Sequence, residues 1–556
     1  MILAFVTAIF LFSINAQAQN TVGLIQYETG NTEGYILFSP ISSTKTYLID
    51  KCGKKINDWS SNYRPGLSVS LLSNGDLFRT GLVNSSYFGT GGGKGGILER
   101  FSWAGQLRWT YKISDSLQCQ HHDAMVLPNG NILAIVWERI SLSQATQAGK
   151  NPSVSTQLNN QELWSEKIIE LKPSGSDQAV IVWQWRAWDH LVQEFDQTKS
   201  NFGTVRQHPE LIDVNYVVQG PPSNSDWLHF NSIDFDTLNN QIIVSSHNFQ
   251  EFWIIDHSTT LTQASGHTGG RFGKGGDLLY RWGNPVSYQR GTISDQKLFK
   301  QHHAHFIPSG FQNAGKVLVF NNGVNRPGGN YSSVDIIDIF RAGFPYTINS
   351  SSPFLPEKVD WSYSAPIPSM FYATNIGGAL ALPFGALLIT DGPSGEFFEI
   401  DSTGKIVWEY INPVNATGPV TQGTKPTQNT VFRAEFYPLT FSAFNGIDLT
   451  PKKEIEINPT PPSSCTLLND IENQNFIGFE LFPNPAETEQ KVMIRYHMNK
   501  EVKFSIMNEL GQEVYSTSIS IVNQPANIVL PQLRSGVYYV RLYHGEGSAI
   551  KKITIF

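Results

Sequence analysis

Short runs of alternating apolar and polar residues dominate the chain between residues 35 and 450, and most of them end at Gly, Asn-Gly or Pro turns. Alternation with a period of two places every second side chain on one face, which is the pattern of a half-buried β-strand. The runs group into six similar copies, each with four strands, one of which is built around Trp. Such four-stranded repeats are typical of propeller blades, so we predict a six-bladed β-propeller over residues 19–450.

The pattern changes at both ends of this region. Residues 451–475 are rich in Pro and Ser and are expected to form an exposed linker. Residues 476–556 contain further short alternating strands and predict a small Ig-like β-sandwich. The predicted fold class is therefore all-β: a six-bladed β-propeller followed by a small Ig-like β-sandwich.

Residues 1–18 form an apolar run that ends in Ala16-Gln17-Ala18, a small-residue cleavage signature, although the usual basic n-region is missing. The alternative is an uncleaved membrane anchor, but the run is short for a span. We predict a signal peptide, and a mature protein that is exported and contains no membrane span.

Composition excludes several classes of function. The net charge is -7 and no basic run is present, which argues against nucleic acid as a partner. The three cysteines, Cys52, Cys119 and Cys465, are too few for a disulfide framework or a cysteine-based zinc site. One pair can still form, and the sequence does not indicate which.

Histidines recur where predicted strands begin. His122 and His302 each stand six residues before a proline that closes the strand, which predicts equal depth along two repeated strands. His229 opens the corresponding strand of the third copy, and Asn231 follows on the same side. Two other copies have Leu67 and Gly377 at this register, so the repeat itself does not require histidine. We predict that these side chains converge on one site.

Two kinds of chemistry suit such a group. Three imidazoles can hold zinc with an open position, but Asp123 is the only obvious carboxylate ligand nearby, so we expect neither a metal nor another cofactor. Imidazole can instead act as a nucleophile while a second histidine acts as acid and base. This division of roles suits sulfuryl or phosphoryl transfer, in which charge spreads over several oxygens.

The motifs "HHDAMVLPNGNIL", "DWLHFNSIDFD", "QHHAHF" and "LLITDGPSGEFFEIDSTGKIVWEY" resemble those of the bacterial arylsulfate sulfotransferases. The resemblance implies an exported six-bladed propeller that moves a sulfuryl group from an aryl sulfate to a phenolic acceptor, without a nucleotide donor and through a sulfohistidine. It implies that His302 is transiently sulfated, that His122 or His229 protonates the leaving phenolate, and that Asn231 holds a sulfuryl oxygen.

One residue departs from the family pattern. Where the family has Ser-Ser-Arg, this chain has Ser245-Ser246-His247, and histidine carries charge only when protonated. Either His247 or another cation such as Arg433 replaces the arginine, or the donor differs. His303, adjacent to His302, is an alternative nucleophile.

The tail resembles the C-terminal sorting domain of the type IX secretion system of Bacteroidetes, on "FPNP" at residues 482–485, "NELGQEV" at 508–514, "SGVYYV" at 535–540 and Lys551-Lys552. This implies secretion or display on the outer cell surface, with the secretion machinery as partner. Two other functions stay open: a non-catalytic surface propeller that acts as an adhesin or glycan-binding module, and a metal-dependent hydrolase in the same funnel.

Overall fold

The computed structural model describes residues 20–556 except 29, 90–91, 156–161, 217–224, 341–343, 345, 347, 350, 461–464, 466–479, 483, 496–500, 509–511, 521–525 and 545–546. The predicted signal peptide, residues 1–18, lies outside the described residues. None of the helices in the described part of the chain has the length and apolar character needed to cross a bilayer.

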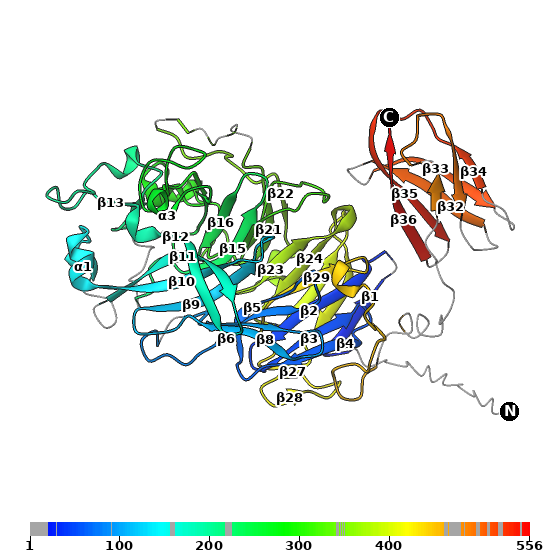
Figure 1. The fold of residues 1–556 in the computed structure, drawn as a ribbon, viewed down its shortest axis with the longest axis horizontal. Helices are drawn as coiled ribbons and strands as arrows, with labels where there is room; N and C mark the ends of the chain where they lie inside the picture. The colour runs from blue at the N-terminus through cyan, green and yellow to red at the C-terminus, as the bar shows by residue number, and fades with distance from the viewer. Residues whose placement is uncertain are drawn as a thin grey trace, which may run out of the picture.

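Six sheets of four or five strands form the larger part of the molecule (Figure 1). The first sheet contains β29 (Val431–Pro438), β2 (Gly34–Pro40), β3 (Lys45–Asp50) and β4 (Lys55–Ser60). The second contains β5 (Pro65–Leu71), β6 (Leu77–Leu82), β7 (Gly96–Phe101) and β8 (Leu107–Lys112). The third contains β9 (Gln118–Val126), β10 (Ile132–Ser141), β11 (Glu162–Ser174) and β12 (Gln178–Arg186).

The other three sheets follow in chain order. The fourth contains β15 (Phe230–Asp236), β16 (Gln241–Ser246), β17 (Glu251–Asp256) and β18 (Tyr280–Trp282). The fifth contains β19 (His302–Phe306), β20 (Val317–Asn321), β21 (Ser333–Ile337) and β22 (Trp361–Tyr363). The sixth contains β23 (Gly378–Ala381), β24 (Leu387–Asp391), β25 (Glu396–Ile400), β26 (Ile406–Ile411) and β1 (Gly23–Tyr27). Shorter elements are β13 (Leu191–Val192) with β14 (Ile212–Asp213), β27 (Val414–Asn415) with β28 (Gly418–Pro419), and helices α1 (Leu142–Gln147), α2 (Pro152–Ser155) and α3 (Leu261–Ala264).

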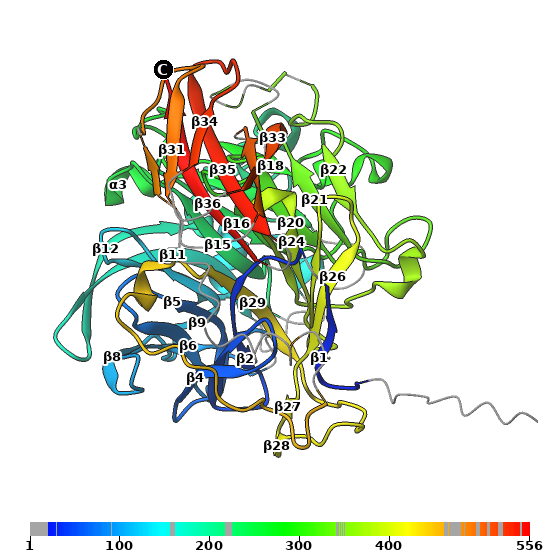
Figure 2. The same cartoon turned by 90° about the vertical axis from the view of Figure 1, so that its right-hand side faces the viewer.

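The six sheets are arranged in a closed ring. One edge strand of each sheet contacts the edge strand of the next, in the order β29, β5, β9, β15, β19, β23 and back to β29. Both ends of the ring segment complete a sheet: β29 pairs with β2, and β1 pairs with β26 (Figure 2). Closure of this kind leaves few unpaired strand edges. We interpret the six sheets as the six predicted blades.

Hydrophobic clusters fill each of the six junctions between neighbouring sheets. Between the third and fourth sheets, for example, buried Trp185 lies in one cluster with Phe230 and Trp253. This packing explains why the strands are apolar on both faces. Each sheet is covered by a neighbour on each side, so the stability of the ring comes from burial between sheets.

The repeated tryptophan has a structural explanation. On the last strand of five sheets, an indole N–H donates to a backbone carbonyl of the next sheet: Trp59 to Ser102, Trp109 to Gln178, Trp185 to Gly276, Trp282 to Pro356 and Trp408 to Lys51. Each such bond contributes about 1 kcal/mol net and fixes the sheet-to-sheet register. The repeat that the sequence predicts does not coincide with one observed sheet, because it starts at a different strand. It joins the outer strands of one sheet to the inner strands of the next.

Most described residues of the segment after the ring are exposed, yet part of the segment pairs with the ring. Residues 452–460, which we call the strap, exchange backbone hydrogen bonds with the ring: Lys452 N–H donates to the Lys55 carbonyl, and Ile457 N–H donates to Val420. Cys465 then forms a disulfide with Cys52, which closes a loop of 413 residues. The remaining cysteine, Cys119, is buried, and burial raises its thiol pKa to about 11. Backbone pairing and the disulfide thus hold this polar segment against the propeller.

The tail contains a three-stranded sheet of β30 (Glu480–Phe482), β31 (Lys491–Arg495) and β34 (Ala526–Val529), and a four-stranded sheet of β33 (Glu513–Ser520), β32 (Glu501–Met507), β35 (Gly536–His544) and β36 (Gly547–Ile555). Side chains of both sheets, including Val492, Phe504 and Leu542, share one buried cluster. The predicted class, an all-β propeller followed by a β-sandwich, is confirmed.

Candidate active site

Four histidine rings form a row where the inner strands begin. The ring centroids of His122 and His229 lie 4.6 Å apart, those of His229 and His247 lie 4.9 Å apart, and those of His247 and His302 lie 5.3 Å apart. His122 belongs to β9, His229 precedes β15, His247 follows β16 and His302 begins β19. The three predicted histidines therefore meet, and His247 lies between two of them. We call these four residues the histidine cluster.

The backbone beside the cluster has an unusual conformation. His122, His229 and His303 have positive φ angles of 47°, 53° and 50°, which non-glycine residues adopt rarely. At these points the inner strands carry bulges that interrupt their pairing. In β19 the left-handed residue is His303, one position later than the sequence register implies. Leu67 in β5 and Ile376 before β23, at the inner strands of two sheets that lack such a histidine, also have positive φ angles, so this conformation is a feature of the repeat.

The bulge in β19 separates the two candidate nucleophiles. His302 joins the cluster, whereas the His303 ring stacks on that of His305 with 4.2 Å between centroids. A Cβ on Gly378 would come within 2.7 Å of His303 Nδ1, so His303 packs tightly against β23. The structure thus places His302 with the other three rings and turns His303 toward another group.

One buried amide fixes the tautomer of His302. Asn322 donates its side-chain N–H groups to the carbonyls of Ala373 and Ile376, so its Oδ1 is the acceptor facing His302 Nδ1 at 2.7 Å. Nδ1 therefore carries the proton, and Nε2 keeps its lone pair. Burial lowers the pKa of His302 to about 3, so the ring is neutral at physiological pH. With the proton on Nδ1, the lone pair that could act as a nucleophile is the one on Nε2.

A carboxylate holds His229 instead. The Asp226 Oδ2 atom lies 2.5 Å from His229 Nδ1, and its other oxygen accepts the indole N–H of Trp137. Burial alone would lower the pKa of His229, but the charge of Asp226 and its hydrogen bond raise the pKa above the ordinary value. His229 can therefore hold a proton at a pH at which His302 does not.

His122 lies at the other end of the row and is backed by a second histidine. Its Nδ1 lies 2.8 Å from Nδ1 of His121, and His121 Nε2 lies 2.7 Å from the Glu166 carboxyl. The His121 ring stacks on Trp137 at 3.9 Å. Burial lowers the pKa of both histidines well below the ordinary value and raises that of Glu166. His122 thus enters the cluster as a neutral ring.

The cation beside the cluster is a lysine that sequence reasoning missed. Lys300 stands two residues before His302, and its Nζ donates to Oδ1 of Asn248. Burial lowers the pKa of Lys300 to about 8, against the attraction of Asp226. Burial and the charge of Lys300 together lower the pKa of His247 well below its usual value. His247 is therefore neutral, and Lys300 carries the positive charge. Its position directly before the Gln-His motif was the available sequence signal.

Arg433 is engaged elsewhere. Its guanidinium pairs with both oxygens of Asp123, at 2.8 and 2.9 Å, and with Glu435 at 2.9 Å. Two carboxylates already compensate its charge. One N–H of the Asn231 amide donates to the Gln301 carbonyl, at the residue before His302, while its Oδ1 is buried without a partner among the described residues.

A glycine-rich loop, which the sequence marked only as a loop, packs on His122. His122 N–H donates to the Gly93 carbonyl, and a Cβ on Gly93 would lie 1.9 Å from the His122 ring. Gly92 lies next to His229, since its Cβ would be 3.7 Å from that ring. Glycine at position 93 allows the backbone to approach the His122 ring, whereas a Cβ at position 92 would make only an ordinary contact with His229.

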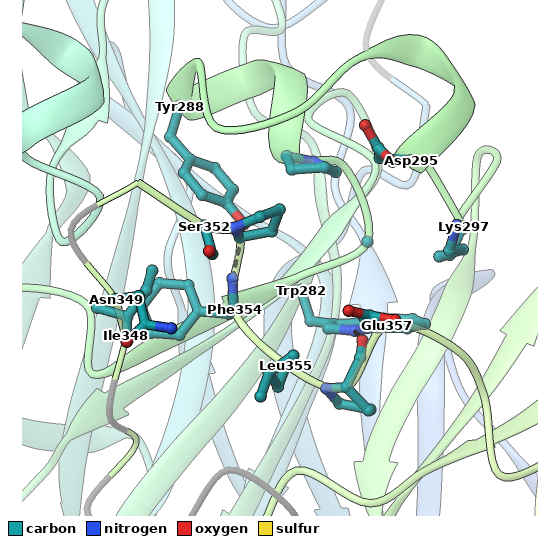
Figure 3. Close-up of a pocket in the computed structure, with 14 residues that line it drawn as sticks. Trp282, Tyr288, Asp295, Lys297, Ile348, Asn349, Ser352, Phe354, Leu355 and Glu357 are labelled. Atoms are coloured by element: carbon teal, nitrogen blue, oxygen red, sulfur yellow. Dashed lines mark hydrogen bonds between the residues drawn. The ribbon is translucent and has the colours of Figure 1, made fainter.

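A separate cavity of about 510 Å³ lies between the segment after β18 and residues 348–357 (Figure 3). Trp282, Tyr288 and Phe354 form its aromatic side, and Asp295, Lys297 and Glu357 contribute charges. None of its lining residues belongs to the histidine cluster.

Comparisons with known proteins agree with this description. The family model "Arylsulfotransferase (ASST)" matches residues 81–433, which include all four residues of the cluster. The model "Secretion system C-terminal sorting domain" matches residues 480–556. No curated protein matches the chain at a significant level.

Several solved structures show a distant likeness. A putative 6-phosphogluconolactonase from Bacteroides fragilis is 11% identical, with 73% of this chain and 98% of that chain covered and a TM-score of 0.34. The periplasmic gluconolactonase of Pseudomonas aeruginosa is 10% identical, with 90% and 100% covered and a TM-score of 0.32. Virginiamycin B lyase from Staphylococcus aureus is 11% identical, with 71% and 89% covered and a TM-score of 0.32. Scores this low carry no argument about function.

The two family matches cover both structural units. The sorting tail indicates that the protein is secreted or held at the cell surface. The match over residues 81–433 spans most of the ring, and the chain belongs to the arylsulfotransferase (ASST) family.

Proposed function

We propose that the protein transfers a sulfuryl group from an aryl sulfate to a phenolic acceptor through a covalent intermediate on His302. The observation that carries this proposal is the hydrogen bond from His302 Nδ1 to Asn322, which leaves a neutral ring with its lone pair on Nε2. A nucleophile needs that lone pair, and a merely structural histidine does not.

In the first half of the reaction, His302 Nε2 attacks sulfur and forms an N–S bond. The S–O bond to the aryl group breaks, and its electron pair leaves with the phenolate oxygen. His229 donates its proton to this oxygen, a role that its raised pKa supports. His122, whose ring touches that of His229, is the alternative proton donor, although burial lowers its pKa.

In the second half, the acceptor phenol returns a proton to His229 and its oxygen attacks sulfur. The N–S bond breaks, and the electron pair returns to His302 Nε2. No nucleotide donor takes part in either step. The same histidine serves first as acid and then as base, as a ping-pong exchange between two phenols requires.

Lys300 takes the place of the family arginine in this proposal. The sulfuryl group in transfer carries negative charge on its oxygens, and a fixed cation lowers the energy of that state. His247 occupies the position of the arginine but is neutral, and Arg433 is paired with carboxylates. Asn231 acts as a positioning residue, because its amide holds the carbonyl next to His302.

One assay separates this proposal from its competitors. The purified mature protein is given nitrophenyl sulfate with and without a phenolic acceptor, and with and without a chelator. We expect sustained nitrophenol release, beyond one equivalent of enzyme, that depends on the acceptor and persists in the chelator. No release would favour a non-catalytic adhesin or glycan-binding propeller. Release that the chelator abolishes would favour a metal-dependent hydrolase.

A further inference from the structure

A second group of ligand-type side chains lies between the third and fourth sheets, outside the histidine cluster. His190 follows β12, and His267 and Asp277 belong to the segment between α3 and β18, two regions that lie side by side (Figure 1). Among the described residues, this is the group whose three ligand atoms all lie within 4.8 Å of one another. Asp277 Oδ1 is 2.9 Å from His190 Nδ1 and 2.8 Å from His267 Nδ1.

The tautomer of His190 indicates that a positive charge belongs in this group. His190 Nε2 lies 2.9 Å from the Ala264 carbonyl, which can only accept, so Nε2 carries the proton. In a neutral ring, Nδ1 then presents its lone pair to the Asp277 carboxylate. Two electron pairs that face each other at this distance repel unless a proton or a metal ion lies between them. Metal-binding histidines commonly donate their second N–H to a carbonyl in this way.

The surrounding backbone holds these side chains in place. The His190 ring is fully buried and is parallel to Trp185, with 5.6 Å between centroids. The Trp185 indole donates to the Gly276 carbonyl at 2.6 Å. A Cβ on Gly276 would lie 2.1 Å from the Ala264 carbonyl and 2.6 Å from His190 Nε2, so only glycine allows this approach. The imidazole is therefore fixed before any ion arrives.

The other side of the group is open to water. The His267 side chain is 59% exposed and borders a cavity of about 530 Å³ with Trp188 and Asp189. Two imidazoles and one carboxylate form a three-ligand set that suits Zn²⁺, with water at the fourth position. An ion here has both fixed protein ligands and room for solvent.

We propose that His190, His267 and Asp277 bind one divalent transition metal ion, with Zn²⁺ as the best fit. The ion clamps the segment between α3 and β18 onto the end of β12, and thus joins the third sheet to the fourth. This site stabilises the ring and takes no part in the reaction proposed for the histidine cluster.

The test is a calorimetric titration of the metal-free, full-length mature protein with Zn²⁺, with metal content measured after dialysis. We expect one equivalent bound by this group and a higher thermal unfolding midpoint with Zn²⁺. The variants His267→Ala and Asp277→Asn should weaken this binding at least about tenfold and remove the shift in the midpoint. His208→Ala is the matched control, because His208 is also exposed and paired with a carboxylate but lies outside the group.

Three results would overturn the proposal. The wild-type protein does not bind Zn²⁺, in which case a proton satisfies the group. His267→Ala binds as tightly as the wild type. Or the bound equivalent survives His267→Ala and disappears in His229→Gln, which would assign the ion to the histidine cluster. Loss of sulfuryl transfer alone would not bear on this site, since the readout is binding.

Discussion

Two histidines at the start of neighbouring inner strands, His229 before β15 and His302 in β19, occupy similar places in the fold but are held in opposite ways. The partner of His302 is the Asn322 amide, and burial lowers the pKa of His302 to about 3. The partner of His229 is the Asp226 carboxylate, which raises its pKa in spite of burial. The repeated scaffold supplies the positions, and the partner of each ring determines whether it acts as nucleophile or as acid.

The largest expected effect comes from removing the nucleophile. His302→Ala should lower the rate of nitrophenol release at least about a thousandfold, because no covalent intermediate can form. His303→Ala is the matched control and should keep most of the activity, since its ring turns toward His305. The reverse order of the two variants would assign the nucleophile to His303.

Weakening His229 as the proton donor should lower the reaction rate by an amount that depends on the leaving phenol. Asp226→Asn removes the carboxylate that keeps His229 protonated, so we expect a rate loss of about a hundredfold for sulfates of poorly acidic phenols. Nitrophenyl sulfate needs less proton donation and should be affected less. The measurement is the dependence of rate on leaving-group pKa, and an equal loss for all donors would contradict the role of His229.

Variants of Lys300 test whether its positive charge stabilises the sulfuryl group during transfer. Lys300→Met should lower the transfer rate about a hundredfold, and Lys300→Arg should recover part of it. Lys297→Met, a change of the same kind outside the cluster, should have little effect. If Lys300→Met and Lys297→Met have the same transfer rate, the Lys300 cation has no role in stabilising the sulfuryl oxygens.

The pH profile follows from the same groups. His302 must be neutral, which holds above about pH 3, whereas Lys300 must be protonated, and its pKa is about 8. His229 must also hold its proton for the first step. Activity should therefore fall as the pH rises through about 8, and His302 should add no acid limb near neutrality. A rate that rises through pH 8 to 9 would contradict these assignments.

The smallest effect is expected at the amide that orients the nucleophile. Asn322→Ala leaves His302 in place but no longer holds its proton on Nδ1, so the lone pair is not fixed on Nε2. We therefore predict a loss of about tenfold in the rate of His302 sulfation. Thermal unfolding measured alongside separates this from general destabilisation. An unchanged sulfation rate with a lower unfolding midpoint would reduce Asn322 to a structural role.

Much of the fold was predictable because it depends on local patterns. Short strands that end at turns, and the recurring tryptophans whose indoles bond to the next sheet, are readable from the sequence. The alternation predicted half-buried strands, whereas strands such as β16 and β17 are buried along their whole length because a sheet covers each face. The starting point of each repeat was not predictable, because outer strands of one sheet and inner strands of the next are adjacent in sequence. Likewise, strap pairing at Lys452 and Ile457 involves residues far apart in the chain.

The site was predictable in part. Spacing to the strand-closing proline brought out His122 and His302, but the bulge that turns His303 away depends on backbone angles that the sequence does not display. Charge was the harder problem. The position of Lys300 directly before the Gln-His motif was a signal, but the sequence does not show that two carboxylates neutralise Arg433 while Lys300 lies beside the cluster. Those differences come from contacts between distant strands.

The most direct test is to trap the covalent intermediate. The enzyme is mixed with nitrophenyl sulfate without acceptor, quenched at alkaline pH, and digested with trypsin, which releases Gln301–Lys316 as one peptide. Fragmentation by mass spectrometry then locates the sulfuryl group among the histidines of that peptide. We predict a sulfuryl group on His302 that disappears when a phenolic acceptor is added. Release of nitrophenol with an unmodified peptide, or with the group on His303, would contradict the central claim.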